Sequence, residues 1–526
     1  MDQMKLAFIN IPLQNLDFPP AAASLLTGIV EKRMGWDTKI FDFNMYLNSA
    51  VDNDTWLELE KYWRSNIDTI SQETRQQLES TLDTFAVKVN DYDPDWLAVS
   101  VFSRWSTVAC YEVVKILRKK LRCKIFIGGH GIDSWPGSLP TQVNTKTYKT
   151  IADFLRDENL IDHYIIGEGE DSVVELLSGH TEFPGIDGNP PRPVKSLDDV
   201  PLPNYRDVNP NNYYYTSEPG VYITASKGCV RKCTFCNVPD LWPVYTLRNT
   251  DNLVAEIKQN VDQLGVRYHM FTDELCNGSM KHWRAFNKKV VELKDTDVKY
   301  EGIKYRGFMI CRTRKEQDEK DWELMARAGA HLFMVGFESY SERVRKHMGK
   351  HNYSNDDIDF HLEQSGRHGI KNIALFFTGY PTETLEDFEM NKEFLYKHLK
   401  YAKSGTVHMI RWGYTGMFRD PEKVERKGSV EMIIDPDFEA KFKKLPWGIR
   451  DIALGLGWVN KNNPTLTLKE RIRRRLEMHE LCVKLGWPQT RSSDELGILY
   501  NIMKNLEHNK INEQDLTDLD NVIDMH

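Results

Sequence analysis

The chain of 526 residues has few cysteines and no long apolar run. Its eight cysteines are too few and too unevenly spaced for the disulfide framework of a small secreted protein. A transmembrane helix needs about 20 consecutive apolar residues, and the sequence contains no such run. The N-terminus, MDQMKLAFINIP, lacks the basic and then apolar pattern of a signal peptide. These absences predict a cytoplasmic protein without a membrane span.

The sequence also lacks an excess of basic residues. The formal net charge is −8, and lysine and arginine do not gather in a stripe. A nucleic-acid-binding protein usually carries such a basic footprint, because it must neutralise phosphates. Nucleic acid is therefore an unsupported partner, and a small-molecule or natural-product-like substrate is the better expectation.

Apolar runs alternate with helix-like stretches in the first third of the chain, which is typical of a parallel sheet covered by helices. The predicted strands are residues 5–12, 38–43, 96–102, 123–129 and 162–167. A second alternation of the same kind follows a segment rich in proline and asparagine. Its predicted strands are residues 221–226, 266–272, 305–311, 331–337, 373–379 and 405–413.

These patterns predict an α/β protein with three parts. A Rossmann-like domain spans residues 1–184, with an insertion at 44–92. A linker at 185–220 leads to a barrel-like domain at 221–425, since strands and helices alternate there with polar motifs at the strand ends. Residues 426–526 are predicted to form a mainly helical C-terminal region.

Three cysteines lie within eight residues, in the segment ITASKGCVRKCTFCNVP, directly after a predicted strand. Cys229, Cys233 and Cys236 can bind three irons of a [4Fe-4S] cubane and leave the fourth iron open to a ligand. The alternative is a structural zinc site. Such a site needs four ligands, usually from a second cysteine or histidine pair nearby, whereas the next histidine is His269.

With this spacing, the chain resembles the radical S-adenosylmethionine (SAM) superfamily over residues 221–425. The resemblance implies a partial (β/α)6 TIM barrel, a [4Fe-4S] cluster on the three cysteines, and reductive cleavage of SAM to a 5′-deoxyadenosyl radical. It also implies an external electron donor of the flavodoxin or ferredoxin type. Phe235 matches the aromatic position whose backbone lies near the adenine of SAM in this family.

Further landmarks follow in the order of the family. Asp273 and Glu274, in MFTDELCN, resemble the acidic motif that meets the methionyl amino group, although such a pair is also common in solvated turns. Arg312, after YRGFMIC, has a guanidinium fork that suits the SAM carboxylate. An ordinary surface arginine is the alternative at that position.

Two more motifs fall at predicted strand ends. GFES, at 336–339, resembles a signature that places Glu338 and Ser339 beside the ribose and methionine of SAM. GYPTET follows the next strand, and its Gly379 lets the backbone approach the adenine because it has no side chain. An ordinary strand-to-helix turn is compatible with the same residues.

The Rossmann-like unit before the barrel resembles the cobalamin (B12)-binding class of the superfamily, which includes the anaerobic cyclase of tetrapyrrole synthesis. Gly128, Gly129, His130 and Gly131 match a landmark loop of that class and are the candidate cobalamin contacts. The chain lacks the D-x-H-x-x-G pattern that supplies an axial histidine, so His130 is expected as a loop residue rather than a cobalt ligand. A domain that keeps the fold without the cofactor is the alternative.

The leading hypothesis is a cobalamin-dependent radical SAM enzyme that methylates an unactivated carbon. A radical cyclase, a rearrangement or an oxygen-inserting enzyme of the same architecture is the second hypothesis. From a different class, the chain is a non-catalytic binding protein that carries a cluster.

Overall fold

The computed structural model describes the chain in two compact units. The described residues are 3–65, 70–132, 142–143, 146–147, 150–213, 218–236, 238–398, 404–409, 430–434 and 457–487. The first unit comprises Met1–Ile223 and Asp262–Tyr268, and the second holds most of the remaining residues. The domain limits expected from the sequence stay predictions, and the segment expected as a linker lies within the first unit.

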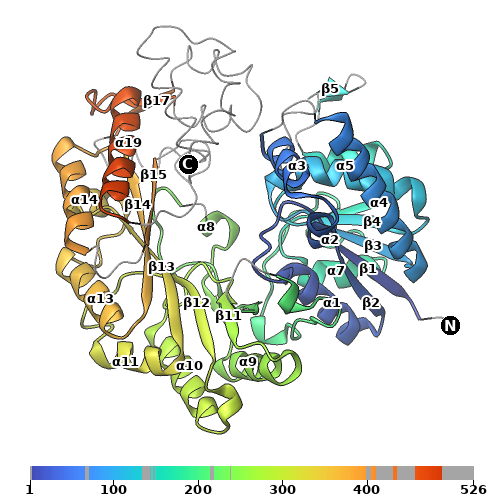
Figure 1. Ribbon diagram of the computed structural model, residues 1–526, viewed down its shortest axis with the longest axis horizontal. Coiled ribbons are helices and arrows are strands. Elements are labelled where there is room, and N and C mark those ends of the chain that lie inside the picture. The colour runs from blue at the N-terminus through green and yellow to red at the C-terminus, as the bar shows by residue number, and fades with distance from the viewer. Residues whose placement is uncertain are drawn as a thin grey trace. The chain divides into compact units, whose positions relative to one another are not determined.

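The first unit contains a five-stranded parallel sheet with the order β2-β1-β3-β4-β7 (Figure 1). These strands are the five predicted from the sequence: β1 (Lys5–Asn10), β2 (Asp37–Asp42), β3 (Trp96–Ser100), β4 (Lys124–Gly128) and β7 (His163–Ile165). The sheet order reverses between β1 and β3. In doubly wound sheets, ligands bind at the carboxyl ends of the strands beside such a switch point.

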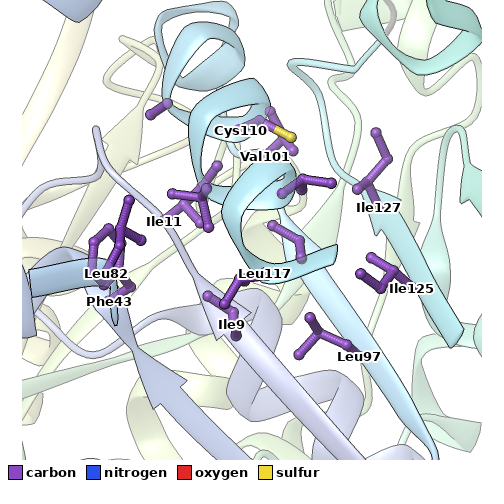
Figure 2. Close-up of a cluster of buried hydrophobic side chains, with 14 of the residues drawn as sticks. Ile9, Ile11, Phe43, Leu82, Leu97, Val101, Cys110, Leu117, Ile125 and Ile127 are labelled. Carbon is purple, nitrogen blue, oxygen red and sulfur yellow. The ribbon is translucent and has the colours of Figure 1, made fainter. Parts of the chain in front are cut away.

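Successive residues of each strand point to opposite faces, and both faces are buried. Ile9 and Leu97 pack in one core with Leu117 of α5 (Thr107–Lys120), as Figure 2 shows. Phe8 and Ala98 pack in the other core with residues of α1 and α7. This unit also contains α1 (Ala21–Met34), α6 (Ile151–Asp157), α7 (Gly169–Leu177), β5 (Gln142–Val143) and β6 (Lys146–Thr147).

The predicted insertion consists of three helices. They are α2 (Phe43–Ala50), α3 (Asn53–Ser65) and α4 (Gln72–Tyr92). Leu82 and Phe85 of α4 join the same core as Ile9, so the insertion extends the hydrophobic core rather than standing apart from it. Ser71 caps α4 by accepting a hydrogen bond from the Thr74 amide.

A second sheet has six strands in the order β15-β14-β13-β12-β11-β8. They are β8 (Gly220–Ile223), β11 (Tyr268–Phe271), β12 (Lys304–Met309), β13 (Ala330–Glu338), β14 (Lys371–Thr378) and β15 (Ser404–Met409). The neighbours from β12 to β15 pair in parallel. The predicted α/β fold class, with a six-stranded partial barrel, is confirmed.

Helices connect successive strands of this sheet and line one side of it in Figure 1. They are α9 (Thr250–Leu264), α10 (Met280–Lys294), α11 (Glu319–Ala328), α12 (Glu342–Met348), α13 (Asn355–Arg367) and α14 (Leu385–His398). Several begin with a side-chain cap, such as the capping boxes of Asp318 and Ser354. Because each helix returns the chain to the edge where the strands begin, all the strand-to-helix loops meet at the carboxyl ends of the strands.

Beyond β15, the described residues form a small antiparallel pair, β16 (Met432–Ile434) and β17 (Trp458–Asn460), and the helix α19 (Leu468–Lys484). Much of the region expected to be mainly helical lies outside the described residues. No helix within the described parts of the chain has the length and apolar character needed to cross a bilayer.

Candidate active site

The three cysteines lie in a loop that begins after β9 (Ser226–Lys227), a short strand paired with β10 (Thr246–Leu247). The backbone turns toward the sulfurs: the Arg231 amide donates to Cys229 Sγ at 3.4 Å. The Val238 amide donates to Cys236 Sγ at the same distance. The Cys236 amide donates to the carbonyl of Cys233 at 3.1 Å. The two amide donors to sulfur favour the thiolate forms of Cys229 and Cys236.

The three thiols suit a multinuclear cluster. A mononuclear zinc site needs four ligands around one centre, and within the described residues no three His, Cys, Asp or Glu side chains converge on one ion position. A cubane places each thiolate on a different iron, so its ligands need no common point. Burial raises the pKa of Cys229 and Cys233, and it raises that of Cys236 to about 12. Bound iron would oppose this effect, because a metal cation stabilises the ionised thiolate.

Two other elements anchor this loop. The Thr234 amide donates to the carbonyl of Met348, at the end of α12, at 3.0 Å. The hydroxyls of Thr234 and Tyr380 lie 2.9 Å apart, and His347 Nδ1 lies 2.9 Å from the Tyr380 hydroxyl. Phe235 packs edge-on against Phe377 of β14, with ring centroids 5.0 Å apart. Residues more than 140 positions apart in sequence thus fix the loop.

Asp273 ties the β11 loop to the start of the cysteine loop. It is buried, and its carboxylate accepts hydrogen bonds from the Ala225 amide at 2.9 Å and the Ser226 hydroxyl at 2.5 Å. Burial raises the pKa of Asp273 to about 7, against the opposing effect of these hydrogen bonds. Both of its carboxylate oxygens are therefore already used in holding the loop, and its contact with SAM stays a prediction.

Glu274 and Arg312 lie on the neighbouring loops. Glu274 is exposed, and desolvation by the surrounding protein raises the pKa of its carboxyl. Arg312 turns inward: its guanidinium donates to the carbonyl of Asn277 at 2.7 Å and to that of Gly278 at 2.5 Å. The same guanidinium also pairs with the Glu316 carboxylate, at 3.3 Å. Much of the predicted carboxylate-binding fork is thus engaged with the loop after β11.

Glu338 occupies the end of β13 in a conformation unusual for a residue with a side chain. Its φ is 65°, where the register of β13 and β14 shifts. Its carboxylate is buried and pairs with Lys350, with Nζ 2.6 Å from Oε1. Lys350 also donates to the carbonyl of Gly336 at 2.9 Å. This buried pair holds Glu338 in place.

Ser339 is fully buried beside Glu338. Its hydroxyl donates to Asn391 Oδ1 of α14 at 3.0 Å, and its carbonyl accepts from Arg345 at 2.8 Å. The sequence places Ser339 at the correct strand end, but the bonds formed by its side chain run into the protein. Contact with the SAM ribose stays a prediction.

Gly379 follows β14 with a φ of 74°. A Cβ at this position would lie 2.9 Å from Cγ of Arg471, a buried residue of α19. Its amide donates to the Glu383 carboxylate at 3.1 Å, and Glu383 in turn pairs with Arg474 at 2.8 Å. The missing side chain therefore makes room for α19 as well as setting the turn.

Sequence reasoning missed the residues that support the site. Their contacts join residues that lie far apart in the sequence, so no local pattern specifies them. The pairs are Lys350 with Glu338, His347 with Tyr380, Tyr380 with Thr234, and Arg474 with Glu383, at separations of 12, 33, 146 and 91 positions. Lys350 stands in the basic stretch RVRKHMGKH, so no local signal distinguishes it from the neighbouring arginines and lysines.

In the first unit, the predicted loop after β4 lies beside the loop after β3. A Cβ on Gly129 would lie 2.5 Å from the Val101 carbonyl oxygen, and one on Gly131 would lie 2.2 Å from that of Ser103. These glycines are thus required by close packing of two loops. His130 is exposed on the same loop. Phe102, which belongs to none of the predicted motifs, follows β3 with 61% of its surface exposed.

The model of the radical SAM superfamily matches residues 223–395. This part of the chain is a radical SAM domain. It contains the cysteine loop, both acidic strand ends and the turn at Gly379. A radical SAM domain takes a [4Fe-4S] cluster and SAM. Cys229, Cys233 and Cys236 are free thiols, and their role as the ligands of this cluster stays a prediction.

Two curated relatives and one solved structure extend the comparison. The chain is 23% identical over 344 residues to an uncharacterized methyltransferase of Pyrococcus horikoshii, which covers 61% of this chain and 69% of the relative. It is 25% identical over 279 residues to the anaerobic magnesium-protoporphyrin IX monomethyl ester cyclase of Synechocystis. That match covers 49% of this chain and 54% of the cyclase, so it spans about half the length of that relative.

The structure is similar to that of the cobalamin-dependent SAM radical enzyme OxsB, solved with aqua-cobalamin and SAM. The TM-score is 0.62 with 16% sequence identity, over 98% of this chain and 70% of OxsB. At this identity the likeness shows a shared fold across nearly the whole chain. It leaves reaction and substrate open.

We predict that Gly379→Ala destabilises the protein more than Gly369→Ala. Both glycines have positive φ, 74° and 72°, so both substitutions carry a backbone cost of about 1–2 kcal/mol. Only the Cβ at 379 also meets Arg471, whereas no atom lies within 4 Å of the Cβ position at 369. Urea unfolding of the two variants measures the difference, and equal destabilisation would contradict the contact with α19.

Proposed function

We propose that this chain is a cobalamin-dependent radical SAM enzyme that methylates an unactivated carbon of a small-molecule substrate. The observation that carries the first part is the cysteine loop, whose three thiols sit at the carboxyl ends of parallel strands inside the radical SAM domain. The second part is supported by a doubly wound sheet in the same chain.

Cys229, Cys233 and Cys236 would hold the cluster, which when bound supplies an open iron for SAM and the electron that cleaves it. The surrounding residues keep the thiols in place and exclude water. Phe235 and Phe377 pack against a buried group that includes Met348, Tyr380 and Trp458. Glu338 and Gly379 stand at neighbouring strand ends, where they would orient the amino acid and adenine parts of SAM.

Cobalamin is the proposed second cofactor, and when bound it would supply the methyl group. We expect a large flat ligand to bind at the carboxyl edge of the first sheet. Its order reverses between β1 and β3, which is where doubly wound sheets bind ligands. Phe102 presents an exposed aromatic ring directly after β3, and the side-chain-free backbone of Gly129 is exposed on the next loop.

A radical cyclase remains the second candidate function, because the similarity to the Synechocystis cyclase covers nearly half of this chain. Both reactions need reduction by an external one-electron donor. They differ in whether a methyl group from SAM reaches the product.

The cluster assignment predicts that Cys233→Ala abolishes SAM cleavage and lowers bound iron and sulfide. The replacement removes one of three thiolates, and alanine has no donor atom with which to replace it. The measurements are iron and sulfide content and 5′-deoxyadenosine release, made anaerobically with dithionite. Cys110→Ala is the matched control, since Cys110 is a buried thiol in the core of the first unit. A wild-type chain that binds zinc without sulfide would refute the assignment.

The cobalamin proposal predicts that Phe102→Ala weakens cobalamin binding about tenfold, because it removes an aromatic surface worth roughly 1–3 kcal/mol when covered. Binding is measured by titration with hydroxocobalamin and optical spectra. Val87→Ala, another exposed apolar residue of the same unit, should bind as the wild type does. Equal affinities for the two variants would show that cobalamin, if bound, does not use this edge.

Methyl transfer is tested with SAM carrying a labelled methyl group. We expect the label to appear on carbon in a product formed by the reconstituted protein with an extract of candidate small molecules. SAM cleavage with cobalamin bound, but with product that contains no label, would favour the cyclase or rearrangement instead. If the protein retains an intact cluster and cleaves no SAM, the non-catalytic binding protein is favoured.

A further inference from the structure

Lys350 belongs to none of the sequence motifs, yet it forms a buried ion pair with Glu338 of GFES and lies beside the cysteine loop. Lys350 is 7% exposed. Its ammonium nitrogen lies 5.7 Å from the ring centroid of Phe235, a residue that stands between Cys233 and Cys236 in the sequence. Met348, two residues earlier, accepts the hydrogen bond from the Thr234 amide. The segment that carries Lys350 is thus attached directly to the cysteine loop.

Two positive charges lie at the cysteine loop. Arg231 is part of the loop itself, between Cys229 and Cys233, and Lys350 lies against the ring of Phe235, next to Cys236. Lys350 is buried, whereas Arg231 is only half-buried. Water and salt screen an exposed charge much more than a buried one. The charge of Lys350 should therefore act on the loop more strongly than charges at the surface.

We propose that Lys350 is a positioning residue whose fixed positive charge stabilises the reduced cluster held by the three cysteines. Reduction would transfer one electron from an external low-potential donor to the bound cluster without breaking a bond, so it would add one unit of negative charge at the loop that Lys350 contacts. Net charge near a cluster is one of the factors that set its potential. Glu338 holds the ammonium in place at 2.6 Å and partly offsets its charge.

This inference rests on the proposed cluster, and it makes opposite predictions for the two members of the pair. Lys350→Gln should lower the ratio of reduced to oxidised cluster about tenfold at a given applied potential. For a one-electron couple this corresponds to a midpoint potential lower by about 59 mV. Glu338→Gln should shift the potential upward. Lys350→Arg keeps the charge and should restore a value near that of the wild type.

The experiment is an anaerobic redox titration of the reconstituted full-length chain, with dithionite as reductant and the reduced cluster followed by electron paramagnetic resonance. Iron and sulfide are counted for each variant. Lys346→Gln is the matched control, since it removes the same charge four residues earlier from an exposed position of α12. Its potential should stay close to that of the wild type.

The outcomes separate the two proposals. Unchanged potential in Lys350→Gln with a full complement of iron overturns this inference and leaves the cluster assignment intact. If Lys350→Gln takes up no iron, the Glu338→Gln variant decides, and an unchanged or lower potential there overturns the inference. A wild-type chain without iron and sulfide overturns the proposed function itself.

Discussion

The site depends on one constraint of parallel sheets: every strand ends at the same edge. Helices return the chain to the opposite edge each time, so the loops after β8, β11, β12, β13 and β14 must meet. The hydrogen bonds at this edge are the result. Asp273 reaches Ser226, Thr234 reaches Tyr380, and neither contact joins residues near in sequence. The cysteine loop has little regular structure of its own, so these contacts hold it.

Two buried ion pairs lie at the same edge. Glu338 with Lys350, and Glu383 with Arg474, are pairs in which both side chains are less than a tenth exposed. Burying an isolated charge is costly, whereas a paired and hydrogen-bonded charge is tolerated. Each pair therefore fixes the position of both members. Glu338 has a positive φ of 65°, in the left-handed region, and its ion pair with Lys350 stabilises this conformation.

The sequence predicted the strands of both sheets, because their apolar runs are long and bounded by turn residues. It also located the cysteine loop and the acidic and glycine-rich strand ends, since those patterns are local. It could not identify what each side chain contacts. The fork of Arg312 is turned to the carbonyls of Asn277 and Gly278, and Ser339 is turned to Asn391. Such contacts depend on the packing of neighbouring loops, which leaves no periodic signal.

By itself, the sequence determined the alternation of strands and helices, the spacing of three thiols, and the glycines that permit the turns. These are properties of short segments, set by side-chain chemistry and backbone sterics. Only the tertiary structure decided that α19 packs against Gly379, that Lys350 pairs with Glu338, and that Gly129 and Gly131 are required by the loop after β3. The physical reason is that each of these contacts joins elements whose separation in space is fixed by the packing of the sheet and its helices, and not by their separation along the chain.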